Sequence, residues 1–374
     1  METATNSLLS GIRVLDLSRL LPGPFCTLYL AQLGAEVIKI EEPNGGDYAR
    51  ASTDLFAQVN RGKKSVTLDL RKAADVELFH RMVEQADVVV ETFRPGVMDK
   101  LGCGYGKLKQ LNPRLVYAAL TGYGQNGPYR DRPGHDMNYC GYAGALDQIG
   151  SAGGPPSPLN FQIADLAGGA LTCIVGILAA VFGARASGQG TMVDVAMLDG
   201  TLALQVATLA TLRATGKAAP RGQDVLSGAL PNYSIYETAD GKYLAVGALE
   251  YKFFARTCAL VGRPDLLKKP MAPGKAGQEL RDELTALFKS RTRDEWEKLL
   301  AHEDTCVSAI LTPEEALQNE QVRARGLVRS EGGKPAFGLP IQFSMPLPAL
   351  GPSPALGAHT SEVLERLGLK PAVT

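Results

Sequence analysis

Short apolar runs and amphipathic segments alternate along the first 125 residues of the chain. Apolar runs of roughly four to eight residues between Gly, Pro and polar residues predict strands, and a 3.6-residue spacing of apolar positions predicts helices. The predicted strands are 12–17, 36–40, 65–70, 87–91 and 115–120, and the main predicted helices are 22–33 and 73–85. Such alternation builds a parallel sheet with helices on its faces, so we expect an α/β fold.

The middle of the chain follows a different pattern. The Gly and Pro residues of 151–158 predict a loop. A long apolar helix is predicted from Asp165, and it carries no charge between Leu166 and Phe182. This length is at the lower limit for a membrane span, but the Gly and Ala content favours a helix buried on all sides, so no span is expected. A short strand at 192–194 and a second long helix at 198–215 are predicted next.

The last third of the chain predicts a smaller unit. Segments 233–238 and 242–246 flank Ala239-Asp240-Gly241, which indicates a hairpin. Thr292 and Thr312 are each followed three residues later by Glu, the spacing of a capping box. The proline-rich tail at 346–354 should be extended, and a final helix is predicted at 361–367.

Composition limits the classes of function. The chain has 374 residues, of which 45% are hydrophobic, enough for one large and one smaller domain. Basic and acidic residues number 39 each, which argues against nucleic acid or an acidic membrane as the main partner. Its six cysteines are scattered without metal spacing, so neither a metal site nor a disulfide framework is expected. No targeting signal is visible, and we expect a cytoplasmic protein.

Two residues are candidates for proton transfer. His135 lies in Gly134-His135-Asp136-Met137-Asn138-Tyr139, and Asp165 opens the apolar helix. On opposite faces of one carbon, they could remove a proton from one side and return it on the other. Alternatively, His135 is an ordinary hydrogen-bonded side chain and Asp165 is a helix N-cap. The free N–H groups of that helix could also bind an enolate oxygen, with Gly168 and Gly169 allowing close approach of a ligand.

A dinucleotide site at the N-terminus is not favoured. The first strand, turn and helix, with Glu41 near the end of the second strand, invite that interpretation. The fingerprint needs three glycines, and 21–26 supplies only Gly23.

The chain resembles the family III CoA-transferases of the CaiB/BaiF type, and among them most closely the α-methylacyl-CoA racemases. The order and spacing of several segments over nearly the whole chain carry this resemblance: 11–17, 33–39, 66–70, 93–96, 121–128, 134–139 and 190–194. It implies an interlocked-ring homodimer. It also implies a large CoA-binding α/β domain with a Rossmann-like parallel sheet at 1–224 and 325–374, and a smaller α+β domain with its linkers at 225–324.

The resemblance implies His135, Asp165 and Glu250 as catalytic residues, with Glu250 contributed by the small domain. The expected reaction inverts the α-carbon of 2-methyl-branched acyl-CoA thioesters by 1,1-proton transfer through an enolate. The alternative is a CoA-transferase, in which Asp165 is the nucleophile that forms an acyl anhydride. A binding or sensing protein for acyl-CoA is a third hypothesis. No cofactor is expected beyond the coenzyme A of the substrate.

The resemblance also places ligand contacts along the chain. The residues implied in binding coenzyme A are Leu68, Asp69, Leu70, Arg71, Thr92, Phe93, Arg94, Lys100, Gly134, Asp136, Met137, Asn138 and Tyr139. The family often has Arg where this chain has Glu42, so one phosphate contact must be missing or replaced. Candidates for the replacement are Lys39, Arg61, Lys63 and Lys64. The identity of the acyl group stays open.

Overall fold

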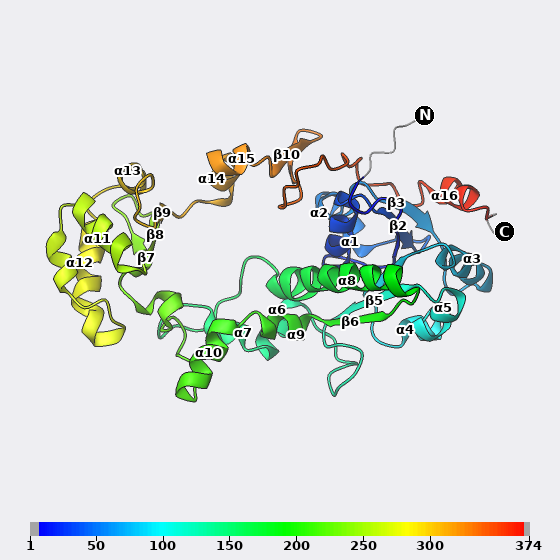
Figure 1. Ribbon diagram of the computed structural model, residues 1–374, viewed down its shortest axis with the longest axis horizontal. Helices are drawn as coiled ribbons and strands as arrows, with labels where there is room; N and C mark the ends of the chain where they lie inside the picture. Colours follow the sequence, from blue (N-terminus) through cyan, green and yellow to red (C-terminus); the bar gives the residue numbers. More distant parts are fainter. Residues whose placement is uncertain (1–6, 370–374) are drawn as a thin grey trace. The chain divides into compact units, whose positions relative to one another are not determined.

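The structure is a computed structural model that describes residues 7–369 (Figure 1). The chain folds into two compact units. Unit 1 contains the described parts of Met1–Ala145, Leu159–Leu204 and Arg325–Thr374, and unit 2 contains Leu146–Pro158 and Gln205–Ala324. The second part of unit 2 begins at Gln205, whereas the sequence places the domain boundary at residue 225; the domain assignment itself stays a prediction.

Unit 1 is built on a parallel sheet, which within the described residues has six strands in the order β3-β2-β1-β4-β5-β6. The strands are β1 Arg13–Asp16, β2 Glu36–Glu41, β3 Lys64–Thr67, β4 Val88–Glu91, β5 Val116–Thr121 and β6 Met192–Ala196. The α/β class predicted from the alternating pattern is confirmed for this unit. The strand order reverses between β1 and β4, and a crevice for ligands lies outside the carboxyl ends of strands at such a point.

Helices cover both faces of this sheet, which is why its central strands are almost entirely buried. Their bounds are α1 Pro22–Gln32, η1 Tyr48–Ala51, α2 Thr53–Asn60, α3 Ala73–Val83, α4 Val97–Lys100, α5 Tyr105–Leu111, α6 Asp136–Tyr142, η2 Ala164–Leu171, α8 Thr172–Ser187, α9 Met197–Ala203 and α16 Thr360–Arg366. Leu15 and Val89 pack with Phe79 of α3, Leu108 of α5 and Val363 of α16. The C-terminal helix α16 therefore packs into the same core as β1, the first strand of the chain.

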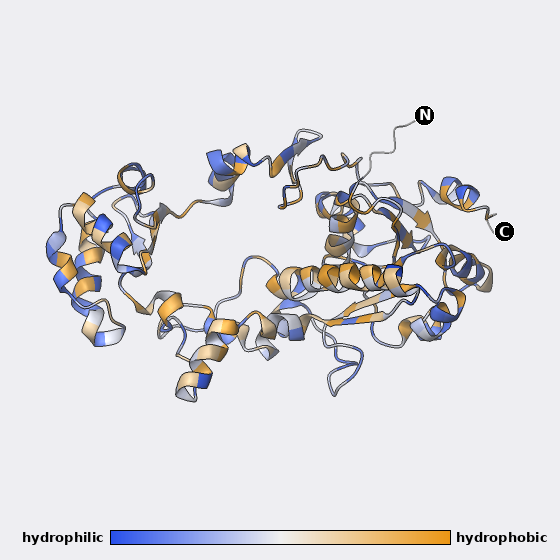
Figure 2. Cartoon of the chain, viewed as in Figure 1, coloured by the Kyte–Doolittle hydropathy of each residue, from blue (hydrophilic) through white to orange (hydrophobic). Residues whose placement is uncertain are grey.

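The long apolar helix differs from the prediction in two respects. Its first two turns are the π-helix η2, and the α-helix α8 begins only at Thr172. It is also not buried on all sides, because Val175 and Phe182 are 68% and 79% exposed. Figure 2 shows that hydrophobic residues predominate along this helix. Among the described residues, Ala164–Ser187 alone has the length and composition to cross a membrane. Core helices of soluble proteins share this length and composition, so these two properties alone do not make the segment a membrane span.

The second long helix predicted at 198–215 is instead two helices. The chain leaves helical geometry at Gln205, with φ −84° and ψ 45°, between α9 and α10 (Val206–Thr215). Neither Gly nor Pro stands at the break, so the apolar pattern alone did not reveal it.

Unit 2 combines a small antiparallel sheet with helices. The predicted hairpin is confirmed as β7 Tyr233–Glu237 and β8 Tyr243–Gly247, and β9 Val307–Ala309 adds an unpredicted strand. The helices are α7 Ala145–Gln148, α10, η3 Val225–Ala229, α11 Tyr251–Leu260, η4 Pro264–Lys268, η5 Gly274–Gly277, α12 Gln278–Phe288, α13 Arg293–Leu300, α14 Pro313–Gln318 and α15 Glu320–Ala324. Both predicted capping boxes form, at Thr292 and Thr312.

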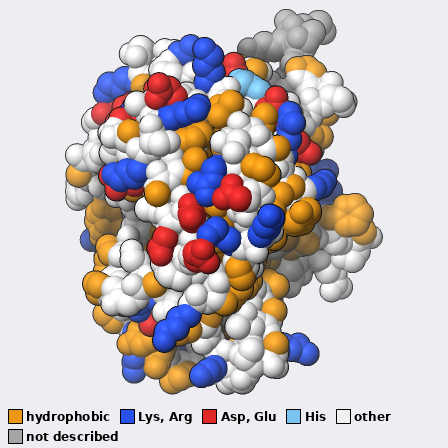
Figure 3. All heavy atoms as spheres, turned by 90° about the vertical axis from the view of Figure 1, so that its left-hand side faces the viewer, with side chains coloured by type: hydrophobic (Ala, Val, Ile, Leu, Met, Phe, Trp, Pro, Cys, Tyr) orange, Lys and Arg blue, Asp and Glu red, His pale blue; other side chains and the backbone are white. Residues whose placement is uncertain are grey.

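Unit 2 has its own core, in which Phe254, Phe288 and Trp296 are almost completely buried. The face in Figure 3 carries basic and acidic side chains interspersed with one another. The remaining strands, β10 Val328–Glu331 and β11 Lys334–Phe337, form a hairpin in the returning segment of unit 1.

Candidate active site

Two of the segments predicted to contact coenzyme A fall at one edge of the unit 1 sheet. Leu68 to Arg71 directly follow β3, which ends at Thr67 rather than at residue 70 as predicted. Thr92, Phe93 and Arg94 directly follow β4. Parallel strands bring their carboxyl ends to the same edge, so these two segments and the turn after β1 share the edge at which ligands of such sheets bind.

A network of buried charged side chains supports the turn after β1. The Oδ2 atom of Asp16 lies 3.0 Å from Nζ of Lys63, and Lys39 pairs with Asp47 at 2.9 Å. All four side chains are fully buried. Burial alone would raise the pKa of Asp16, but the two lysines and hydrogen bonds from Ser18 and Thr27 lower it to about 2. Lys39 and Lys63 therefore stabilise the interior and are not free to bind a phosphate, contrary to the expectation.

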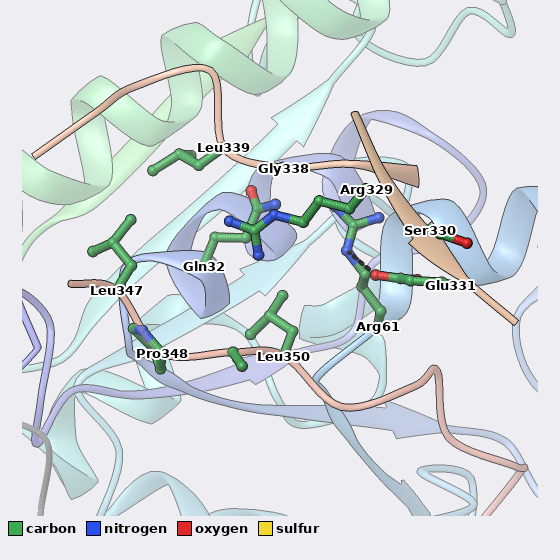
Figure 4. A pocket seen from close by; sticks show the side chains of 11 residues that line it. Gln32, Arg61, Arg329, Ser330, Glu331, Gly338, Leu339, Leu347, Pro348 and Leu350 are labelled. Carbon is green, nitrogen blue, oxygen red and sulfur yellow. Dashed lines mark ion pairs between the residues drawn. The ribbon is translucent and has the colours of Figure 1, made fainter. Parts of the chain in front are cut away.

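Arg61 and Lys64 are also occupied by protein groups. Lys64 pairs with Glu362 at 2.6 Å. Arg61 pairs with Glu331 at 3.4 Å and donates to the carbonyl oxygen of Phe337. It lines a cavity of about 200 Å³ that the returning segment forms over the end of α1 (Figure 4).

This cavity belongs to the opposite edge of the sheet. Gln32 ends α1 just before β2 begins, and Arg61 lies just before β3. Both residues therefore stand near the amino ends of the strands. Arg61 fastens the returning C-terminal segment, and it does not replace the phosphate contact that the sequence lacks at Glu42.

The histidine motif forms a hydrogen-bonded turn at the start of α6. His135 is the N-cap residue, and its backbone N–H donates to Oδ1 of Asn138 at 3.0 Å. The Tyr139 hydroxyl donates to the carbonyl oxygen of Gly134 at 2.5 Å. A Cβ atom on Gly134 would lie 2.7 Å from the Tyr139 ring, so only Gly fits there. The imidazole of His135 and the side chain of Met137 remain exposed.

Asp165 is tied directly to this motif. It stands in the first turn of η2, and its backbone N–H donates to Oδ1 of Asp136 at 2.9 Å. The N-cap residue is Ile163, so the hypothesis that Asp165 caps its own helix is wrong. Asp136 of α6, next to His135, caps η2 instead, because its carboxylate accepts the hydrogen bond from this N–H group.

The side chain of Asp165 has the properties of a proton-transfer group. Burial raises its pKa from 3.8 to about 7, and the neighbouring carboxylate of Asp136 adds to the rise. Both the protonated and the ionised form are therefore populated near neutral pH, as acid–base catalysis requires. Carboxyl groups shifted by burial and a like charge are typical of functional sites.

Two expectations about η2 are wrong. The N–H groups of Asp165 and Leu166 already donate to Asp136 and to the carbonyl oxygen of Gln162, so they are not free for an enolate oxygen. Gly168 and Gly169 pack against α9 rather than opening to a ligand. A Cβ atom on Gly168 would lie 2.5 Å from Oγ1 of Thr201.

Glu250 lies in unit 2, at the N-cap position of α11, and is exposed. Its role beside His135 stays a prediction. Among the other predicted contacts, Asp69 and Arg71 form an ion pair of 2.7 Å, while Arg94 and Lys100 are exposed.

Sequence reasoning missed two residues of this edge. Arg19 follows β1, and its backbone N–H donates to the hydroxyl of Thr92 at 3.1 Å. Glu91 is buried and accepts from the N–H of Phe93 at 2.7 Å. Burial raises the pKa of Glu91 to about 7 against the opposing effect of that hydrogen bond. The signal for both was present, since each is a charged residue at or beside the carboxyl end of an apolar strand.

Comparison with known proteins defines the family. The chain matches CoA-transferase family III over residues 9–360. α-Methylacyl-CoA racemase from Homo sapiens is 38% identical over 323 residues, which cover 85% of this chain and 81% of the relative. Acetyl-CoA:oxalate CoA-transferase from Acetobacter aceti is 34% identical over 348 residues, which cover 89% and 88%. The crystal structure of a CaiB/BaiF family protein from Brucella suis aligns with a TM-score of 0.86 at 31% identity, covering 97% of this chain and 100% of that chain.

The chain therefore belongs to CoA-transferase family III, and the resemblance seen in the sequence is confirmed. It is an enzyme of the group that contains the CoA-transferases and the acyl-CoA racemases. Relatives named for both activities are similar to it.

Proposed function

We propose that this enzyme is an acyl-CoA racemase that inverts the α-carbon of 2-methyl-branched acyl-CoA thioesters. The observation that carries the proposal is the half-buried Asp165 with a pKa of about 7, joined through Asp136 to the motif that holds His135. A racemase must both remove and return a proton, so each group has to exist in two protonation states. A carboxylate nucleophile needs only its ionised form, which burial disfavours here.

In the proposed reaction, neutral His135 removes the α-proton from one face of the thioester, which gives the enolate. Protonated Asp165 donates a proton to the other face and becomes a carboxylate. The reverse reaction exchanges the two roles. Glu250 is proposed to orient the imidazole and to stabilise its protonated form, as carboxylates beside catalytic histidines do. Coenzyme A is bound at the carboxyl edge of the sheet, and no other cofactor takes part.

The alternative function is CoA transfer between carboxylic acids with Asp165 as nucleophile. The similarity to named CoA-transferases supports it. The two reactions differ in what they need, because racemisation takes place without an acceptor acid, whereas transfer passes through an anhydride that hydroxylamine can trap.

The test follows the α-proton of a 2-methylacyl-CoA in heavy water. We expect deuterium to enter the α-carbon and chirality to be lost without any added acid. His135→Ala and Asp165→Asn should each lower the exchange at least about 100-fold, the lower end of what a general acid or base contributes. His302→Ala, an exposed turn residue of unit 2, is the matched control.

Absence of exchange together with a trapped Asp165 adduct would replace the racemase by the transferase. Binding of the thioester with neither reaction would leave a binding protein.

We also propose that the enzyme is a homodimer. The exposed stripe of Leu171, Val175 and Phe182 on one face of η2 and α8 supports this, because contiguous exposed apolar surface marks interaction sites. The interlocked arrangement and the cytoplasmic location stay predictions from the sequence.

A further inference from the structure

The turn after β1 is fixed on several sides. The Nζ atom of buried Lys39 donates to the carbonyl oxygen of Ser18 at 2.7 Å. The N–H of Arg19 donates to Thr92, and the N–H of Leu20 donates to Oδ1 of Asp47 at 2.8 Å. Leu20 has φ +63°, a backbone conformation that residues other than Gly rarely adopt. Such strain persists only where the surroundings impose it, and it gathers at ligand sites.

This turn holds Arg19 between two aromatic rings. The Cζ atom of Arg19 lies 5.1 Å from the ring centre of Phe93 and 5.0 Å from that of Tyr48. Its Nη1 atom donates to the Tyr48 hydroxyl at 3.1 Å. A guanidinium group that rests on ring faces is positioned by them while its N–H edges remain available.

Arg19 also lacks a carboxylate partner. Among residues 7–369, no Asp or Glu forms an ion pair with it, and its side chain is only partly buried. Of the other arginines around this edge, Arg50 pairs with Glu41 and Arg71 pairs with Asp69. Arg94 is exposed, and no aromatic ring among the described residues holds it as Phe93 and Tyr48 hold Arg19. A positioned guanidinium without an anion, at the strand-order reversal between β1 and β4, is suited to an anionic ligand group.

We propose that Arg19 binds a phosphate group of coenzyme A, either the 3′-phosphate or the pyrophosphate, with Phe93 and Tyr48 as its support. The proposal rests on the proposed function, because it takes a CoA thioester as the ligand of this edge. Arg19 would supply the phosphate contact that none of Lys39, Arg61, Lys63 and Lys64 is free to make. It is a binding residue and takes no part in the proton transfers.

The experiment measures binding of CoA, 3′-dephospho-CoA and pantetheine to the full-length enzyme by calorimetry at two salt concentrations. Arg19→Met should weaken CoA binding about tenfold to a hundredfold, as expected for a lost charge-assisted contact, and should leave pantetheine binding unchanged. The salt dependence of CoA binding should also fall. Arg81→Met, which removes an exposed arginine of α3 paired with Glu84 at 3.1 Å, is the matched control and should change nothing.

The three ligands identify the phosphate. If Arg19→Met loses the preference for CoA over 3′-dephospho-CoA, the partner is the 3′-phosphate. If both nucleotides lose affinity equally, it is the pyrophosphate. Arg19→Lys keeps the charge without the planar group and should retain part of the affinity. It provides the same comparison if Arg19→Met does not fold.

Two results would overturn the proposal. One is CoA binding by Arg19→Met equal to wild type with the same salt dependence. The other is an equal loss for pantetheine, which would show that Arg19 only shapes the turn. Failure of the proposed function looks different, since the wild-type enzyme would then exchange no α-proton, whether or not Arg19→Met weakens its binding of CoA.

Discussion

At Asp165, two physical effects act on one carboxyl group in the same direction. Removal from water disfavours the carboxylate, and the negative charge of Asp136 disfavours it further. The same Asp136 accepts the hydrogen bond from the Asp165 backbone, so one residue fixes the position of the acid and shifts its titration. A carboxyl group of this kind reduces the stability of the fold at neutral pH, which is a cost that functional sites commonly carry.

This cost predicts a dependence of stability on pH. Because the folded-state pKa is about 7 and the unfolded value is 3.8, the folded protein binds the Asp165 proton more tightly. The stability from this group is complete below pH 4 and is lost as the pH rises to 7. We expect wild type to lose about 1–3 kcal/mol relative to Asp165→Asn across that range, measured as the urea unfolding free energy.

Asp136→Asn provides the second arm of that measurement. It removes the neighbouring charge but keeps an oxygen that can accept from the N–H of Asp165, so the loss of stability between pH 4 and 7 should become smaller. If the unfolding free energies of wild type and Asp165→Asn changed in parallel over the whole pH range, the pKa of Asp165 would not be raised in the folded protein.

Some of these residue-level features could be predicted from the sequence, and others could not. The motif around His135 and the start of a helix near Asp165 are local patterns in the sequence. The structure has a helix beginning at each of these two places. The bond from Asp165 to Asp136 joins two segments that the sequence separates, so no local pattern indicates it. The stacking of Arg19 on Phe93 and Tyr48 likewise depends on three separate strand ends and turns meeting.

At the scale of elements, the close crossing of η2 and α9 determines where Asp165 lies. Gly168 and Gly200 face each other there, and a Cβ atom on Gly200 would lie 1.9 Å from the carbonyl oxygen of Gly168. The sequence analysis singled out Gly168 but not its partner Gly200, and we expected a ligand beside Gly168 where the structure has α9. The strands were better predicted, because a buried parallel strand is a continuous apolar run and needs no knowledge of its neighbours.

Gly200→Ala should therefore disturb the site through the helix. The added methyl group meets backbone rather than a flexible side chain, so η2 has to move. We expect the unfolding free energy to fall by about 1–3 kcal/mol, as for overpacked cores, and the α-proton exchange rate to fall with it. Both are measured on the same preparation, by urea unfolding and by deuterium incorporation.

Gly183→Ala is the control for that experiment. Gly183 lies within α8, and a Cβ atom there would meet nothing within 4 Å. The change should stabilise the protein by about 0.5–1 kcal/mol, because Ala is the better helix former. If Gly200→Ala behaved like Gly183→Ala, the tight crossing would not position the catalytic carboxyl group.

At the scale of the whole molecule, the sheet order explains why the binding residues gather although they come from distant segments. The strand order reverses between β1 and β4, so the turns that follow these two strands are neighbours. The backbone N–H of Arg19, in the first turn, donates to the hydroxyl of Thr92, in the second. The sequence predicted the parallel sheet but not its strand order, because order is set by crossover connections rather than by the strands themselves. The exposed stripe on α8 was missed for a related reason: an apolar helix looks the same in sequence whether its own chain or another copy covers it.

In the proposed homodimer, a second copy of the chain covers the exposed stripe of Leu171, Val175 and Phe182. A charged side chain placed in this stripe should therefore prevent association. In Val175→Glu/Phe182→Glu, association would bury two carboxylates without partners, and even one unpaired buried charge costs about 3–5 kcal/mol. We expect wild type to sediment as a dimer at micromolar concentration and the double variant as a monomer. Ser187→Glu, an exposed change at the end of the same helix, should leave the dimer intact. A monomeric wild type would leave the stripe without a protein partner, and flotation of wild type with lipid vesicles would assign it to a membrane instead.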